Sequence, residues 1–196
     1  MLTTEIVLEV ATTLKGVGYR HSSEEILEAA IAVALEAGMA GLTFAKVGER
    51  LLISDRTVVY YFPTKPALVA AVVQALGANL EGLLEQAFGS EPRSQTDLAN
   101  RAWPLLTTPM ADRVFALYFE IVGLASAGQA PYDALARGLV EAWVHWLAPR
   151  MLGSTADVRR RRALATVAQI DGLLLLRQVV GAAAADTAAR QAGIRS

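Results

Sequence analysis

The sequence predicts an all-α protein, and three observations lead to that prediction. Alanine and leucine dominate the 196 residues, apolar residues recur every three or four positions, and no alternating apolar–polar run exceeds a few residues. Helix-capping residues and helix breakers punctuate the chain. Two predicted helices are separated by only two or three residues, and helices joined by so short a turn must cross steeply. We therefore expect a helical bundle with a helix-turn-helix unit near the N-terminus.

The first predicted helices precede that unit. A short helix could cover residues 4–14, with Gly16 among the residues that end it. The next helix begins at Ser22, because Ser22 at the N-cap and Glu25 three positions later form a capping box. Its apolar stripe runs toward Gly38, where we expect the helix to end.

The helix-turn-helix unit follows. One helix begins at Thr43, a turn occupies residues 52–53, and a second helix covers residues 55–61. That second segment is rich in β-branched and aromatic residues, but a serine N-cap and the following Pro63 favour a helix over a strand. Gly48 lies on the inner face of the first helix, where the lack of a side chain would let the crossing helix come close.

The remaining chain predicts a larger bundle. Breaks that contain glycine or proline separate its helices. The run of alanines at 182–185 is low in complexity and is expected to be helical. We expect these helices over residues 65–76, 79–88, 95–107, 111–128, 132–150 and 157–184.

Composition excludes several classes of protein. With 54% hydrophobic and 19% charged residues and a mean hydropathy of +0.36, the chain is apolar for a soluble protein. Its longest charge-free run, residues 66–80, is shorter than the ~18 residues that a membrane span needs. Glu5 and Glu9 stand where a signal peptide would be basic. We therefore expect no membrane association, but a cytoplasmic protein that covers its apolar surface by forming an oligomer.

Catalytic and metal-binding chemistry finds little support in the residues. The chain has no cysteine and only two histidines, His21 and His145, so neither disulfides nor a metal site built on Cys or His is expected. No nucleophile, metal-ligand or paired-carboxylate pattern is recognisable. An enzyme is therefore the third hypothesis, and we expect no catalytic residue, no metal and no cofactor.

Several stretches of the N-terminal region occur together in an order and spacing that resemble one known family. They are residues 25–30, 41–44, 49–51, 54–61 and 62–68. Together they resemble the DNA-binding domain of the TetR family of transcriptional regulators, and residues 170–173 resemble a pattern in the late dimer helix of that family. The resemblance implies an N-terminal extension at 1–21, a helix-turn-helix DNA-binding domain at 22–68, and a helical ligand-binding and dimerisation domain at 69–196.

The resemblance makes the second helix of the unit a recognition helix, whose first turns enter the major groove of double-stranded operator DNA. Arg56 could bind guanine, Thr57 a phosphate or a thymine methyl group, and Asp55 the amino group of cytosine. Tyr60 should face the groove, and the Tyr61 hydroxyl should be free to reach a backbone phosphate. The expected DNA-contacting residues are Thr43, Asp55, Arg56, Thr57, Tyr60, Tyr61 and Lys65.

Lys65 stands in the first turn of a helix, where a positive charge opposes the helix dipole. The position becomes favourable if a DNA phosphate binds there, held by free backbone N–H groups, the Thr64 hydroxyl and the Lys65 ammonium. Thr43 begins another helix of the domain and could do the same on the other side of the groove. The alternative for Lys65 is a solvated side chain.

Two helices of the C-terminal half are expected to form a dimer interface. Four consecutive leucines at 173–176 predict a helix that is buried on every side. A matching apolar stripe lies on the predicted helix 132–150. We expect these two helices and their symmetry mates to form a four-helix interface in a homodimer, as the family resemblance also implies. The expected interface residues are Leu139, Trp143, Trp146, Leu173 and Leu174.

Aromatic residues on the middle helices suggest a ligand cavity. Phe115, Tyr118 and Phe119 share one helix face, and Tyr118 would supply a polar group to an apolar cavity. The expected ligand-contacting residues are Trp103, Phe115, Tyr118 and Phe119, and ordinary core packing is the alternative for each. Asp171, in an apolar helix, is expected to be a hydrogen-bonded anchor rather than a base.

These observations support a ligand-responsive, homodimeric transcriptional regulator, a repressor that a small apolar effector releases from its operator. A second hypothesis is a helical small-molecule carrier that has lost DNA binding. It is favoured by the net charge of −2 over residues 22–68, from four basic and six acidic residues. Ala45, Leu52 and Val59 also replace residues that are usual in the family, among them a turn glycine and a tyrosine. A positive face at residues 54–65 would favour the regulator.

Overall fold

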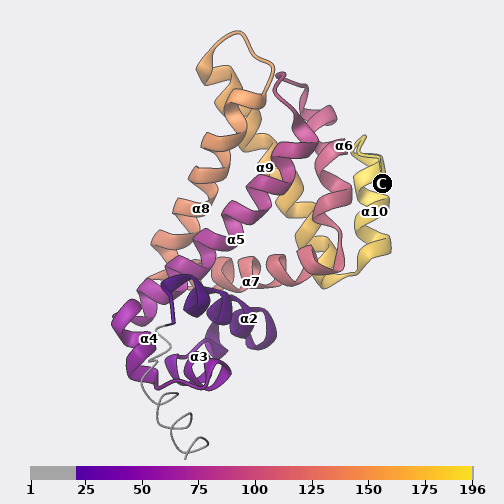
Figure 1. Ribbon diagram of the computed structural model, residues 1–196. Helices are drawn as coiled ribbons and strands as arrows, with labels where there is room; N and C mark the ends of the chain where they lie inside the picture. Colours follow the sequence, from indigo (N-terminus) through magenta and orange to yellow (C-terminus); the bar gives the residue numbers. More distant parts are fainter. Residues whose placement is uncertain (1–20, 196) are drawn as a thin grey trace, which may run out of the picture.

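The computed structural model describes residues 21–195 and has the all-α fold that the sequence predicts (Figure 1). Its elements are α2 (Ser23–Gly41), α3 (Phe44–Leu51), α4 (Asp55–Tyr61), α5 (Lys65–Phe88), α6 (Gln95–Leu106), α7 (Pro109–Ser126), α8 (Tyr132–Leu147), the 3-10 helix η1 (Ala148–Arg150), α9 (Ala156–Val179) and α10 (Ala182–Gln191). Helices α2 to α4 form one end of the molecule (Figure 1). The helix expected at 4–14 lies outside the described residues.

The start of α2 has the expected capping box. Ser22 Oγ accepts a hydrogen bond from the Glu25 backbone N–H at 3.1 Å, and the Glu25 carboxylate accepts one from the Ser22 backbone N–H at 3.0 Å. Gly38, where the helix was expected to end, has a φ of 74° and interrupts the regular backbone. The residue marks a kink, after which residues 39–41 add one short turn.

Two residues determine the steep crossing of α3 and α4. A Cβ atom at Gly48 would stand 2.8 Å from the Ile53 carbonyl oxygen, so only glycine fits beneath the crossing. Leu52 forms the turn in the left-handed conformation, with φ 57° and ψ 38°, and its backbone N–H donates to the last carbonyl groups of α3. A leucine therefore adopts the turn geometry that a glycine usually provides.

Helix α5 is a single helix of 24 residues, whereas the sequence suggested two, at 65–76 and 79–88. The helix continues through the predicted break because both halves are buried, Val73 in the N-terminal core and Leu84 in the C-terminal core. By length and composition alone α5 could cross a membrane. Its packing against α2 and α6 instead identifies it as a core helix of a soluble protein.

The C-terminal end of the chain differs from the predicted single helix at 157–184. Helix α9 ends at Val179, and α10 begins at Ala182 and packs back against α9. Gly181 between them has a φ of 115°, a conformation that glycine adopts without steric cost. The alanines at 182–185 are helical as expected, but they belong to this additional helix.

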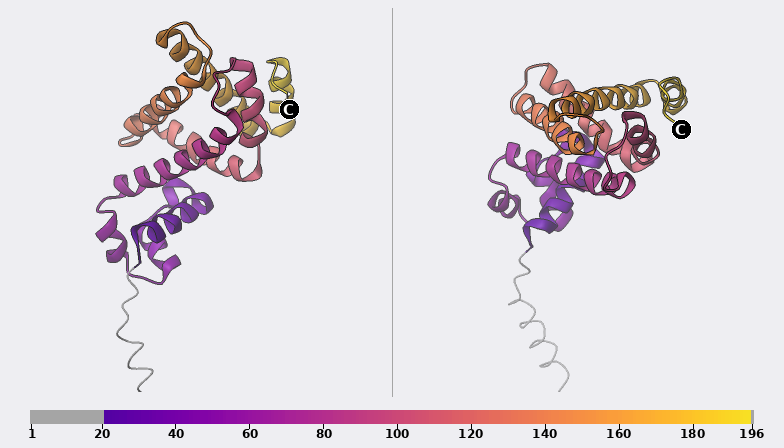
Figure 2. Two further views of the ribbon diagram at one scale, coloured as in Figure 1. Left: turned by 45° about the horizontal axis from the view of Figure 1, so that its top comes forward. Right: turned by 90° about the horizontal axis from the view of Figure 1, so that it is seen from above.

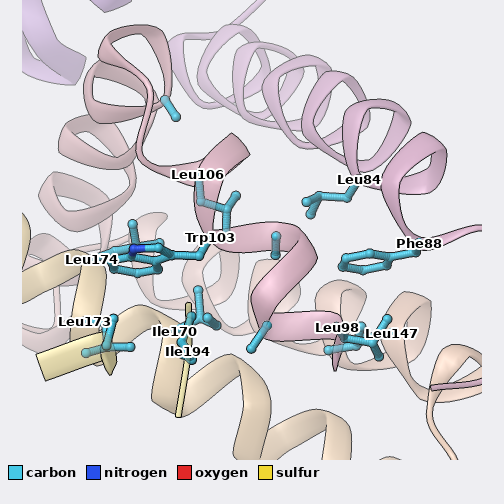
Figure 3. Close-up of a cluster of buried hydrophobic side chains, with 14 of the residues drawn as sticks. Leu84, Phe88, Leu98, Trp103, Leu106, Leu147, Ile170, Leu173, Leu174 and Ile194 are labelled. Carbon is cyan, nitrogen blue, oxygen red and sulfur yellow. The ribbon is translucent and has the colours of Figure 1, made fainter. Parts of the chain in front are cut away.

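Two apolar cores meet along α5 and α7. The N-terminal core joins α2, α3, α4 and the first half of α5, and it also receives Leu117 and Ile121 of α7. The C-terminal core takes side chains from α5 through α10, and Figure 3 shows Trp103 of α6 beside Leu174 of α9. Because α5 and α7 enter both cores, the boundary expected after residue 68 falls inside one continuous helix.

Candidate functional site

Three helices of the N-terminal domain begin with an exposed or half-buried hydroxyl cap. Thr43 caps α3, Ser54 caps α4 and Thr64 caps α5. Each hydroxyl oxygen accepts a hydrogen bond from the backbone N–H of the third residue of its helix. The backbone N–H group of the first residue of each helix has no partner within that helix, and such groups at a helix N-terminus favour an anion.

Helix α4 has one buried side and one open side. Val58 is fully buried, as the sequence predicts, while Arg56 is exposed and Tyr60 is 79% exposed. Asp55 is also exposed, but one of its carboxylate oxygens accepts a hydrogen bond from the backbone N–H of Arg56 at 2.8 Å. The open side therefore offers a guanidinium and a phenol to a partner, beside a carboxylate that is partly used in capping the helix.

The segment 54–65 carries a small positive charge, from Arg56 and Lys65 against Asp55. Both cations are exposed, and within the described part of the chain neither has an ion-pair partner. Lys46 on α3 is also exposed, and it has no ion-pair partner among the described residues. Three cations of the domain are thus available to phosphate groups.

Part of the acidic charge of the domain is used away from α4. Glu25 belongs to the capping box of α2, and Glu36 pairs with Arg50 at 2.8 Å. The net charge of −2 over residues 22–68 is therefore a poor measure of the charge on the face that α4 presents.

Two side chains that were expected to contact DNA make hydrogen bonds inside the domain instead or as well. The Tyr61 hydroxyl donates a hydrogen bond to the His21 carbonyl oxygen at 2.7 Å, so the expectation that it is free for a phosphate is wrong. The cause is geometric, because successive helical residues point about 100° apart and only Tyr60 can face outward. Thr57 is half-buried, and its hydroxyl lies 3.1 Å from Ser54 Oγ.

The C-terminal core contains an apolar cavity of about 90 Å³, whose wall comes from α5, α6, α7, α8 and α9. A second cavity of about 50 Å³ lies next to it. The two share the side chains of Leu80, Phe115, Tyr118 and Trp143. A movement of these shared side chains would join the two spaces into one.

Two polar groups in the wall of the larger cavity bind each other. The Tyr118 hydroxyl donates a hydrogen bond to Asp171 Oδ2 at 2.8 Å, which confirms Asp171 as a hydrogen-bonded anchor. Burial raises the pKa of Asp171, although the hydrogen bond from Tyr118 acts in the opposite direction. Burial and the neighbouring carboxylate also raise the pKa of Tyr118, so its hydroxyl keeps its proton.

Of the four aromatic residues expected to contact a ligand, Phe115 and Tyr118 line the cavity and two do not. Trp103 is only 1% exposed, and its Nε1 donates a hydrogen bond to Asp186 at 3.1 Å, so it joins α6 to α10. Phe119 packs against the C-terminal core beside the cavity, and its ring centroid lies 5.2 Å from that of Tyr118. Both residues support the structure around the cavity.

The side chains expected at the dimer interface are used within the chain. Trp143 and Trp146 line the cavity, and Leu139 packs against the N-terminal core. Leu173 and Leu174 belong to the C-terminal core, with exposed fractions of 9% and 1%. Leu173 and Leu174 are therefore not available to a partner, because an apolar stripe indicates that a helix face is covered but not what covers it. Leu139, Trp143 and Trp146 are half-buried, and their place at a dimer interface stays a prediction.

Helix α9 has a second apolar stripe that faces outward. It consists of Leu164, Ala168, Gly172, Leu175 and Val179, which recur every three or four residues and are all exposed. The neighbouring α8 exposes a row of small residues at intervals of four, Ala134, Gly138 and Ala142, and beside them charged residues such as Arg137 and Glu141. The right-hand view of Figure 2 shows α8 and α9 together along one side of the molecule. We call the five residues of α9 the α9 stripe.

Comparisons with known proteins agree with this architecture. Residues 26–72 match the family model of bacterial regulatory proteins, tetR family. A TetR-family transcriptional regulator from Rhodococcus sp. is 17% identical, with 89% of this chain and 98% of that chain covered and a TM-score of 0.67. A TetR transcriptional regulator from Legionella pneumophila is 19% identical, with 87% and 94% covered and a TM-score of 0.64.

A third solved structure is the multidrug binding protein EbrR in complex with proflavin. It is 23% identical, with 86% of this chain and 95% of that chain covered and a TM-score of 0.63. At these identities the three structures establish a shared fold. No curated protein matches this chain.

Proposed function

Because the chain belongs to the TetR family of transcriptional regulators, we propose that it is a cytoplasmic homodimeric repressor, released from its operator by a small molecule that binds in the C-terminal cavity. The family consists of regulators rather than enzymes, which agrees with the expectation that this chain has no catalytic activity.

The exposed side of α4 is the observation that carries the DNA-binding part of the proposal. Arg56 and Tyr60 project from it, and Lys65 stands unpaired at the capped start of α5. A base-reading helix beside a phosphate-binding helix start is the arrangement that a major-groove protein needs. In a symmetric dimer, two such faces would meet half-sites about 34 Å apart.

The cavity supports the ligand-responsive part. Its wall includes α5 and α7, whose side chains also enter the N-terminal core. A ligand that binds better to one arrangement of these helices would change the population of that arrangement and thus the spacing of the two recognition helices. EbrR has the same fold and was solved with a bound small molecule, which supports this role.

A carrier that has lost DNA binding remains the competing function, because residues 22–68 have a net charge of −2 and Tyr61 is engaged internally. The unpaired Arg56 and Lys65 on the face of residues 54–65 favour the regulator.

The test is binding of the purified protein to DNA that flanks its own gene, followed by fluorescence anisotropy at several salt concentrations. We expect sequence-specific binding that weakens with salt. Lys65→Ala should weaken binding and lower the salt slope by about 2, because a dimer loses one phosphate contact in each subunit. Tyr60→Ala should also weaken binding without unfolding the domain.

A matched control removes the same charge far from α4. Arg101 on α6 is exposed and pairs with Asp97, so Arg101→Gln should leave the operator affinity unchanged. If the wild type shows no specific, salt-sensitive binding, the carrier replaces the regulator. If Lys65→Ala and Tyr60→Ala both bind normally, these residues do not have the roles assigned to them.

A further inference from the structure

The hydroxyl groups in the wall of the larger cavity have already used their protons. The Tyr118 hydroxyl donates to Asp171, and the Thr166 hydroxyl donates to the Arg162 carbonyl oxygen at 2.8 Å. What these groups and the Asp171 carboxylate still offer toward the cavity is lone pairs. A ligand that satisfies them must therefore bring hydrogen-bond donors.

Asp171 also lacks a positive partner. Tyr118 is its one hydrogen-bond partner among residues 21–195, and no ion pair within that range includes it. Arg150 and Arg177 are each paired with a different carboxylate. A half-buried carboxylate without a cation is unfavourable in its ionised form, and the loss of water around it accordingly raises the pKa of this group. A ligand cation would relieve that cost.

The rest of the wall is suited to a cation with an apolar body. Its aromatic side chains are those of Phe88, Phe115, Tyr118, Trp143 and Trp146. The faces of aromatic rings attract cations, and Trp ranks first among them. The protein already uses this interaction next to the cavity, where the Arg150 guanidinium carbon lies 4.0 Å from the centroid of the Trp146 ring.

We propose that the ligand of this cavity is a small organic cation, an alkyl- or arylammonium compound whose positive charge pairs with Asp171 and whose apolar part lies among the aromatic rings. The inference rests on the proposed function, because it names the chemical class of the regulatory ligand. A cavity of ~150 Å³ holds benzene, which is more than the two adjoining spaces provide together, so an arylammonium ligand must also displace side chains that they share, such as Tyr118 and Trp143.

Two probes of nearly equal shape, one charged and one neutral, show whether the charge of a ligand or its size determines binding. Benzylammonium carries the cation, and benzyl alcohol is its neutral counterpart. Binding of each to the full chain is followed by tryptophan fluorescence at constant ionic strength. The wild type should bind benzylammonium about 10-fold more tightly than benzyl alcohol, because only the cation pairs with the Asp171 carboxylate.

Three variants test which side chain causes the preference for the cation and whether the probes bind in the cavity. Asp171→Asn keeps the side-chain volume but removes the charge, so the preference for the cation should disappear. Tyr118→Phe keeps the charge, so the preference should persist. Ala102, which lines the cavity and is 5% exposed, lies against the empty space, and Ala102→Leu should weaken both probes. Circular dichroism verifies that each variant is folded.

The possible failures are distinguishable. If benzyl alcohol binds the wild type as tightly as benzylammonium, or if Asp171→Asn keeps the preference, the cationic class is overturned and the ligand-responsive regulator stands. If neither probe binds the wild type, or if Ala102→Leu weakens neither, the cavity is not a ligand site, and the ligand-responsive part of the proposed function falls with it.

Discussion

Some single residues make the folded state less stable, and Leu52 is one such residue. It adopts a φ of 57° in the turn between α3 and α4, and its side chain is 94% exposed. The side chain therefore contributes almost no packing. Its Cβ nevertheless makes the left-handed backbone about 1–2 kcal/mol less favourable than it would be for glycine.

Replacing this leucine should stabilise the protein. Leu52→Gly removes the strain at an entropic cost of about 0.5–1 kcal/mol, so the free energy of unfolding should rise by about 0.5–1 kcal/mol. Urea denaturation measures the change. Leu52→Ala retains the Cβ atom and should gain nothing, and an equal gain in both variants would contradict the strain argument.

Asp171 also lowers the stability of the folded protein, and the size of this effect depends on pH. Its pKa is raised in the folded protein because burial disfavours the carboxylate. Ionised Asp171 therefore destabilises the folded state at neutral pH, and the penalty fades as pH falls through the raised pKa toward the unfolded value near 4. Tyr118, the other titratable residue of the wall, stays neutral throughout because its own pKa is raised.

Asp171→Asn should accordingly raise the urea midpoint at pH 7, and its advantage over the wild type should shrink toward pH 4.5. Tyr118→Phe removes the hydrogen bond to the carboxylate and should cost about 1–3 kcal/mol at pH 7. An advantage of the asparagine variant that does not change with pH would show that ionisation is not its source.

At the scale of elements, α7 connects the cavity to the DNA-binding domain. Near its start, Asp112 Oδ1 accepts a hydrogen bond from the Arg177 guanidinium of α9 at 2.6 Å. In its middle, two aromatic side chains line the cavity. Toward its end, the Glu120 carboxylate accepts hydrogen bonds from the backbone N–H groups of Met39 and Ala40, at 2.8 and 3.0 Å, just after the kink in α2. A shift of α7 would therefore reach α2 directly.

Glu120→Ala tests this connection. The free energy of unfolding should fall by about 1–3 kcal/mol, because two backbone donors lose their partner. The change in operator affinity on adding benzylammonium, about 5- to 150-fold for a typical allosteric coupling, should shrink toward none. Glu91→Ala, in an exposed loop, is the control for charge. A variant that is less stable but keeps the full response would make Glu120 a purely structural residue.

The sequence predicts the N-terminal elements well because local signals determine them. The caps at Ser22, Ser54 and Thr64 and the break at Pro63 each act within a few residues. The cavity depends on packing between distant segments, and no local pattern reports it: the Tyr118–Asp171 hydrogen bond joins residues 53 positions apart. Amphipathic spacing also could not distinguish side chains that line the cavity from those of the α9 stripe.

At the scale of the whole molecule, no element among residues 21–195 covers the α9 stripe. Leu164 and Leu175 are 47% and 46% exposed, and Val179 is 75% exposed. Two-fold symmetry would place this stripe against its own copy, because an isologous interface uses the same surface on both subunits. Ala168 and Gly172 at its centre are small, which would let the two helices approach closely. We therefore assign the proposed dimer contact to this stripe.

Leu175→Glu should dissociate the dimer. The substitution removes apolar contact from both subunits and places two carboxylates near the symmetry axis, so the dissociation constant should rise about 100-fold, or about 3 kcal/mol. Sedimentation velocity should then find monomers at micromolar concentration. Leu83→Glu is the matched control, since Leu83 is 41% exposed on α5 and lies outside the stripe. Leu175→Glu should also weaken operator binding, because a monomer binds one half-site at a time. The recognition helix itself is unchanged in this variant. A dimer that survives Leu175→Glu but not Leu83→Glu would move the interface to α5.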